Sequence, residues 1–121
     1  MKISRKDAAK LGLPVPAKRH KYGAVACVVD GIRFQSQREA RRYSELKLLE
    51  AAGKICYLAL QVRFYIHSAC GVYVADYYAD FQYRDAAGVR VVEDCKGVRT
   101  PVYRLKKKLV ESEYGITITE V

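Results

Sequence analysis

Apolar residues recur at every second position along one stretch of the chain, residues 58–66. Leu60, Val62, Phe64 and Ile66 are apolar, and polar or tyrosine side chains lie between them. A period of two predicts a strand with one buried face. Further runs rich in β-forming residues predict additional strands, and these runs occupy residues 24–29, 32–34, 72–83, 89–95 and 116–121.

Helical spacing replaces this alternation in residues 36–52. Ser36 followed by Glu39 is the signature of a capping box, and Gly53 ends the segment. After the cap, apolar residues form a ridge at every third position, at Ala40, Tyr43, Leu46 and Leu49. This spacing predicts a helix with one buried stripe.

A second helix is predicted over residues 101–114. Thr100 is a favoured N-cap residue, Pro101 is favoured at the first helical position, and Gly115 ends the segment. One side of this helix is cationic and another is apolar, and the apolar side carries Val102, Leu105 and Leu109.

Two short polar segments predict β-hairpins. Asp30-Gly31 is a strong hairpin signal between the first two β-prone runs. Residues 84–88, which include Gly88, separate the runs 79–83 and 89–95 in the same way. The long run that begins at residue 72 could break near Asp76.

The second hairpin would pair a strand that contains Asp80 with a strand that contains Asp94. Lys96 follows Asp94 by two residues, so a strand would project both side chains from one face. Two carboxylates and an amine brought together on paired strands can hold a divalent cation and a water.

Neighbouring acids leave alternatives at each position. Asp76 is a rival to Asp80, and Glu93 precedes Asp94, but only Asp94 has a lysine two residues later. Glu39 would lie at the edge of the buried stripe of its helix, where the capping box alone would account for it.

The length and composition favour a single domain without a membrane span or a zinc site. The 121 residues are enough for one domain with its own core, and no apolar run is long enough to cross a membrane. The cysteines Cys27, Cys56, Cys70 and Cys95 show no metal-ligand spacing, so we expect reduced, buried thiols rather than a zinc site.

The formal charge of +9 points to a polyanionic partner, with nucleic acid first. A merely well-solvated surface is the alternative, but the cations cluster. Residues 1–22 contain many of them and read as a basic flexible arm, while residues 23–121 read as a single domain. The cations that we expect to contact DNA phosphates are Lys18, Arg19, Lys21, Arg99, Arg104, Lys106, Lys107 and Lys108.

From Ser36 onward, the predicted order is helix, three strands, helix and strand. With acids on the first helix and on the second and third strands, the chain resembles the PD-(D/E)XK nuclease superfamily. It is most similar to the small phage-encoded members grouped with Holliday-junction resolvases. The likeness spans nearly all of residues 30–121 and rests on FQSQREARRYSELKLLEAAGKI, YYADFQY, VVEDCKG and TPVYRLKKKL. Ala79 stands where the superfamily usually has proline.

This resemblance implies an α/β fold with a restriction-endonuclease-like core, in which helices flank a mixed sheet, plus an N-terminal β-hairpin and the basic arm. It also implies a catalytic set of Glu39, Asp80, Asp94 and Lys96. Asp80 and Asp94 would be ligands of Mg²⁺, with Glu39 and the Cys95 backbone carbonyl as further ligands and Mn²⁺ able to substitute.

The activity implied is metal-dependent endonucleolytic hydrolysis of DNA, on a four-way junction as the first candidate. A homodimer follows from the same likeness, because a junction resolvase cuts two strands symmetrically. The implied location is the cytoplasm, that of the bacterial host if the protein is phage-encoded. A nuclease for flaps, single strands or duplex ends, or a non-catalytic nucleic-acid-binding module, remain alternatives.

Overall fold

The structure is a computed structural model that describes residues 25–121. The chain divides into two units, and the boundary between Ala40 and Arg41 lies inside the first helix described here. The predicted basic arm lies outside the described residues, and the prediction of one domain over residues 23–121 stays a prediction.

The first unit contains the predicted N-terminal hairpin. Strands β1 (Cys27–Val29) and β2 (Ile32–Phe34) pair antiparallel. Asp30 and Gly31 form the turn, both with positive φ, which suits the Asp-Gly pair. Helix α2 (Gln37–Ala51) starts after Ser36, whose Oγ accepts a hydrogen bond from the Glu39 amide at 3.2 Å. The cap is therefore where the sequence predicts it.

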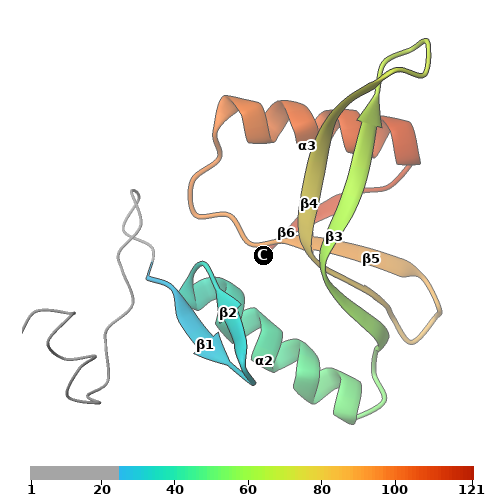
Figure 1. Ribbon diagram of the computed structural model, residues 1–121. Coiled ribbons are helices and arrows are strands. Elements are labelled where there is room, and N and C mark those ends of the chain that lie inside the picture. The colour runs from blue at the N-terminus through green and yellow to red at the C-terminus, as the bar shows by residue number, and fades with distance from the viewer. Residues whose placement is uncertain (1–24) are drawn as a thin grey trace, which may run out of the picture. The chain divides into compact units, whose positions relative to one another are not determined.

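The second unit is built on a four-stranded sheet with the order β3-β4-β5-β6 (Figure 1). Strands β3 (Cys56–His67), β4 (Tyr73–Arg84) and β5 (Arg90–Asp94) pair antiparallel in succession. β6 (Ile118–Glu120) runs parallel to β5, so the sheet is mixed. Helix α3 (Pro101–Tyr114) provides the crossover between them.

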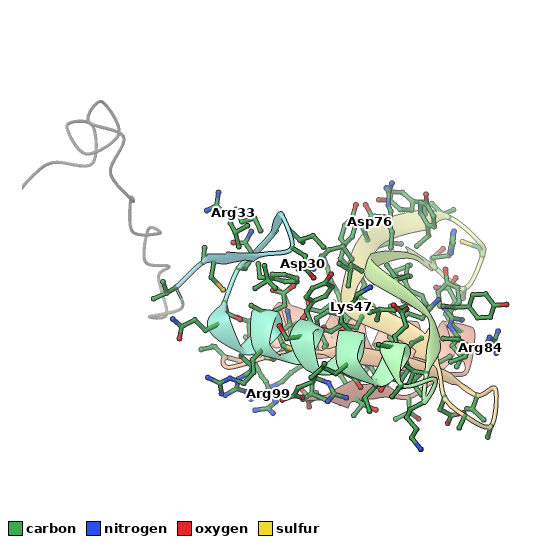
Figure 2. The ribbon with its side chains drawn as sticks, turned by 90° about the horizontal axis from the view of Figure 1, so that it is seen from below. Asp30, Arg33, Lys47, Asp76, Arg84 and Arg99 are labelled. Atoms are coloured by element: carbon green, nitrogen blue, oxygen red, sulfur yellow. The ribbon has the colours of Figure 1, made fainter. Side chains whose placement is uncertain are left out.

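The observed order from α2 to β6 is helix, three strands, helix and strand, as predicted. The α/β class and the mixed sheet are also confirmed. The finer assignment to the restriction-endonuclease fold stays a prediction. β4 does not break near Asp76 but continues to Arg84, and Figure 2 labels both residues.

The turn between β4 and β5 follows the predicted hairpin chemistry. Asp85 Oδ1 accepts hydrogen bonds from the amides of Ala87 and Val89, each at 2.9 Å. Gly88 has a φ of 80°, a conformation that costs glycine little. The local sequence therefore determines the pairing that sets Asp80 against the end of β5.

The core of the second unit lies between α3 and the sheet. Tyr103 and Val110 of α3 pack with Phe64 and Ile66 of β3, together with residues of β4, β5 and β6. Figure 1 shows α3 crossing the β3–β4 hairpin, and α3 contacts both strands. This contact closes the unit around a compact apolar cluster.

The side of α3 that faces this core differs from the one that the apolar spacing suggested. Val102, Leu105 and Leu109 are exposed, whereas Tyr103 is buried. The ring of Tyr103 stacks on Tyr77 with centroids 6.3 Å apart. A tyrosine buries more surface than a valine and also finds a polar partner here, so it determines which side turns inward.

The cysteines differ from the expectation in one respect. All four are free thiols, as predicted, but none is buried, and Cys56 and Cys70 are exposed. Both exposed thiols lie at an end of the β3–β4 hairpin, where burial is low. Within residues 25–121, no helix is long and apolar enough to cross a membrane.

Candidate active site

The β4–β5 pairing brings Asp80 and Asp94 together. Phe81 faces Glu93 in the register, so Asp80 and Asp94 are the next pair of facing residues. Both carboxylates are buried, Asp94 completely. The structure therefore joins two of the predicted site residues at the point where the two strands separate.

Asp80 is held by a hydrogen bond to each of its carboxylate oxygens. Gln61 Nε2 on β3 donates to Oδ1 at 3.1 Å. The backbone amide of Cys95 donates to Oδ2 at 2.8 Å. Asp80 is thereby oriented from both neighbouring strands without being neutralised by a cation at either bond.

Asp94 has a different environment. The hydroxyl of Tyr77 donates a hydrogen bond to Oδ2. Oδ1 is buried and accepts no hydrogen bond within residues 25–121, although Lys96 Nζ lies 3.3 Å away as its ion-pair partner. Buried carboxylate oxygens usually have a hydrogen-bond donor, so Asp94 Oδ1 is only partly compensated, by the ion pair with Lys96.

Burial and, after it, the adjacent Asp80 carboxylate raise the pKa of Asp94 to about 7. Tyr77 and Lys96 act in the opposite direction but do not offset this. The pKa of Tyr77 is itself raised by burial and by the Asp94 carboxylate, so its hydroxyl remains a donor. Because the ionised form of Asp94 is disfavoured beside a second carboxylate, a cation bound here would be stabilising.

Lys96 is half-buried and lies between this pair and the start of α3. Its Nζ sits 5.1 Å from the centre of the Tyr103 ring. The Tyr103 hydroxyl in turn donates to Glu120 Oε2 at 3.0 Å, which links β6 to the site. The ammonium of Lys96 therefore lies over the ring of Tyr103, a residue that the sequence did not single out.

An open cavity of about 260 Å³ gives solvent access to Lys96. Tyr77, Tyr78 and Tyr103 line it together with Lys106, while neither Asp80 nor Asp94 does. Lys96 and Tyr77 both line the cavity and contact Asp94, so these two side chains lie between the cavity and the acidic pair.

Glu93 occupies a separate ionic cluster. Arg42 of α2 binds it with two hydrogen bonds of 2.7 Å, from Nε to Oε1 and from Nη2 to Oε2. The Tyr83 hydroxyl donates to the same carboxylate. The ambiguity between the two adjacent acids is thereby resolved in their contacts, because only Asp94 faces Asp80.

The two carboxylates fit the ligand preference of Mg²⁺. Proteins commonly hold this ion with one or two carboxylates, and waters and substrate phosphates complete its octahedral shell. The carboxylates of Asp80 and Asp94, including the Asp94 Oδ1 atom that accepts no hydrogen bond from the described residues, match that pattern. In the described part of the chain, no group of three or more His, Cys, Asp or Glu residues is arranged to hold a metal. Water, substrate phosphate and the further ligands that the sequence predicts would complete the shell.

Two predicted ligands have other observed contacts. Cys95 is half-buried and uses its backbone amide toward Asp80, and the ligand role of its carbonyl stays a prediction. Glu39 is buried in the first turn of α2, where its backbone amide donates a hydrogen bond to Ser36 Oγ. It belongs to the first of the two units.

The predicted phosphate contacts near α3 fall into two groups. Arg99, labelled in Figure 2, pairs with Glu120 at 2.8 Å, and Lys107 lies 3.6 Å from the same carboxylate. Arg104 and Lys108 are exposed, and Lys106 is half-buried at the cavity. Lys18, Arg19 and Lys21 lie outside the described residues.

Several residues of the site carried little signal in the sequence. Tyr77 looked like a sheet-packing tyrosine, Tyr103 sat between the apolar and cationic sides of its helix, and Gln61 looked like an outward-facing strand residue. Each gains its role from a partner distant in sequence, as Gln61 does from Asp80 across β3 and β4.

Comparison with protein families assigns the chain to a group without an established function. A family model described as protein of unknown function (DUF1064) matches residues 19–119. The chain belongs to the DUF1064 family. The comparisons with curated proteins and with solved structures found no match.

Proposed function

We propose that the protein is a Mg²⁺-dependent DNA endonuclease of the PD-(D/E)XK type. The observation that carries the proposal is the buried Asp80–Asp94 pair with Lys96 Nζ 3.3 Å from Asp94 Oδ1. A buried pair of carboxylates destabilises a fold unless a cation or a proton offsets the charge. Retaining it beside a half-exposed lysine is typical of a functional site.

In this proposal, Asp80 and Asp94 hold the ion, and Mn²⁺ can substitute for Mg²⁺. When bound, the ion would acidify water and offset negative charge on a phosphodiester. Gln61 and the Cys95 amide keep the Asp80 carboxylate in place, and Tyr77 does the same for Asp94. These contacts are made in advance, so the carboxylates need little reorganisation when DNA arrives.

Lys96 is the proposed catalytic cation. From its position at the cavity, its ammonium can orient the attacking water and donate to a phosphate oxygen on which charge develops. The face of Tyr103 and the Asp94 carboxylate together limit where Nζ can go. Glu39 is proposed as a third acid of the set on the strength of the family resemblance.

DNA is the proposed substrate because the charge of +9 favours a polyanion. Arg104 and Lys108 expose cations on α3, and Lys106 adds one beside the cavity. A four-way junction and a homodimer are proposed from the resemblance alone, since the fold does not fix the substrate.

The test is incubation of the full chain with labelled four-way junction, flap, single strand and linear duplex, each with Mg²⁺ or with EDTA. Symmetric cleavage of the junction with Mg²⁺ alone is the expected result. Preferential cutting of flaps, single strands or duplex ends would keep the chemistry but change the substrate. Tight binding of DNA without cleavage of any form would make the protein a non-catalytic binding module.

A further inference from the structure

Strand β3 contains two non-glycine residues with positive φ, Tyr57 at 57° and Gln61 at 50°. This left-handed region is unfavourable for residues with a Cβ and is rare inside a strand. Such strain persists only where the surroundings require it, and it is often found at functional sites. The two positions differ in what surrounds them.

The strain at Tyr57 has a reason in the sheet itself. Cys56 pairs with Arg84 but Ala59 pairs with Gln82, so the register shifts across Tyr57. An irregularity of this kind makes room for an unusual backbone conformation. Tyr57 is also 80% exposed.

The strain at Gln61 has no such reason. Leu60 pairs with Phe81 and Val62 with Ala79, so the register is unchanged on either side. Gln61 thus stands opposite Asp80, to which its side chain donates at 3.1 Å. The unusual backbone conformation occurs at the one residue of β3 that bonds to the acidic pair.

The chemistry of glutamine also suits this position. Its amide donates a hydrogen bond to Asp80 Oδ1 and adds no charge. A lysine or arginine there would neutralise the carboxylate and compete with a bound cation. Gln61 can therefore fix the rotamer of Asp80 while leaving its charge available.

We infer that Gln61 is a positioning residue for the cation site, held in a strained conformation so that its amide orients Asp80. This inference rests on the proposed function. It predicts that relief of the backbone strain keeps or raises the stability of the fold. Loss of the side-chain amide weakens cation binding at the site.

The experiment compares Gln61→Gly with Tyr57→Gly in the full chain. Glycine adopts positive φ readily, so each variant should keep or raise the melting temperature in EDTA, by up to roughly 5 °C. Gln61→Gly should weaken Mn²⁺ binding by roughly 10- to 100-fold, as loss of a hydrogen-bond partner of a ligand commonly does. Tyr57→Gly should leave it unchanged. Free Mn²⁺ is measured by electron paramagnetic resonance without DNA, and junction cleavage is measured in parallel.

Each outcome separates the inference from the proposed function. Wild-type protein that binds Mn²⁺ and cleaves, with Gln61→Gly equal to it in both, overturns the role of Gln61 alone. A Gln61→Gly protein that melts well below wild type and Tyr57→Gly also overturns it, since the strain would then not be relieved. Wild-type protein that neither binds Mn²⁺ nor cleaves any DNA overturns the proposed function and the inference with it.

Discussion

Glu93 and Asp94 are adjacent on β5 and both are buried, yet their surroundings have opposite electrostatic character. Glu93 receives two hydrogen bonds from the Arg42 guanidinium and one from Tyr83, so its charge is matched. Asp94 faces a second carboxylate, and its Oδ1 atom accepts no hydrogen bond from the described residues. Burial alone therefore does not distinguish the two acids. They differ in charge compensation, which the described residues leave only partial at Asp94.

The strongest test of this comparison is to remove each charge in turn. Asp94→Asn and Asp80→Asn should each abolish cleavage while DNA binding stays equal or becomes tighter, because a negative charge facing phosphate is lost. Labelled junction with Mg²⁺ measures cleavage, and a mobility shift in EDTA measures binding. Unchanged cleavage by either variant would refute the metal-site assignment.

Glu93→Gln is the matched control for those variants. It should retain cleavage at temperatures where it is folded, because Glu93 does not face Asp80. Its free energy of unfolding should fall by roughly 1–3 kcal/mol, since Arg42 loses a charged partner. Urea denaturation of the three variants beside wild type measures the difference.

Lys96→Ala should lower the turnover rate by roughly 10²- to 10⁴-fold with little loss of affinity, because its proposed role is in the transition state. Lys106→Ala is the comparison, since both lysines line the same cavity. The second variant should weaken binding more than turnover. If the loss at Lys96 followed affinity and disappeared at low salt, Lys96 would be a phosphate contact only.

Glu39→Gln separates capping from catalysis at the third acid. Glutamine can make the same capping hydrogen bond, so stability should change little. If the charge of Glu39 serves the reaction, this variant should lose most cleavage while melting at or above the wild-type temperature in EDTA. Wild-type cleavage at limiting Mg²⁺ would assign Glu39 to the cap.

The raised pKa of Asp94 predicts how stability depends on pH without metal. The carboxyl has a pKa of about 7 in the folded protein, against an ordinary value of 3.8. Between these values the folded state binds more protons than the unfolded state, so the free energy of unfolding falls as pH rises from about 4 to about 7. Asp94→Asn lacks this contribution.

The free energy of unfolding of wild type should therefore fall relative to that of Asp94→Asn as the pH rises across that window. One pKa unit corresponds to about 1.4 kcal/mol, and we expect at least this much. Saturating Mg²⁺ should flatten the wild-type curve by favouring the ionised pair. Parallel curves for the two proteins in EDTA would show that Asp94 is ionised throughout.

The smallest effect concerns the cations of α3. Replacing exposed Arg104 and Lys108 with alanine should flatten the dependence of log affinity on log salt by roughly one unit per lost contact. Replacing Arg99 and Lys107 should change it less, because both interact with Glu120. Equal slopes for wild type and the first double variant would make that side of α3 a solvated surface.

Much of the fold could be predicted from the sequence because its signals are local. Helix α3 begins after the N-cap Thr100 at Pro101 and ends before the C-cap Gly115. The turn around Asp85 determines the β4–β5 hairpin. That hairpin fixes the register, and the register brings Asp80 and Asp94 face to face. The acidic pair was therefore predictable from turn chemistry and strand periodicity.

Only the tertiary structure decided how the two buried acids of β5 differ and which side of α3 is buried. Arg42 is 51 residues from Glu93, and Tyr77 is 17 residues from Asp94. Local periodicity contains no information on such partners, because strand pairing and helix packing select them. Gln61 could not be predicted for the same reason, because its hydrogen-bond partner Asp80 lies on the neighbouring strand. Its backbone conformation is also one that no local pattern in β3 predicts.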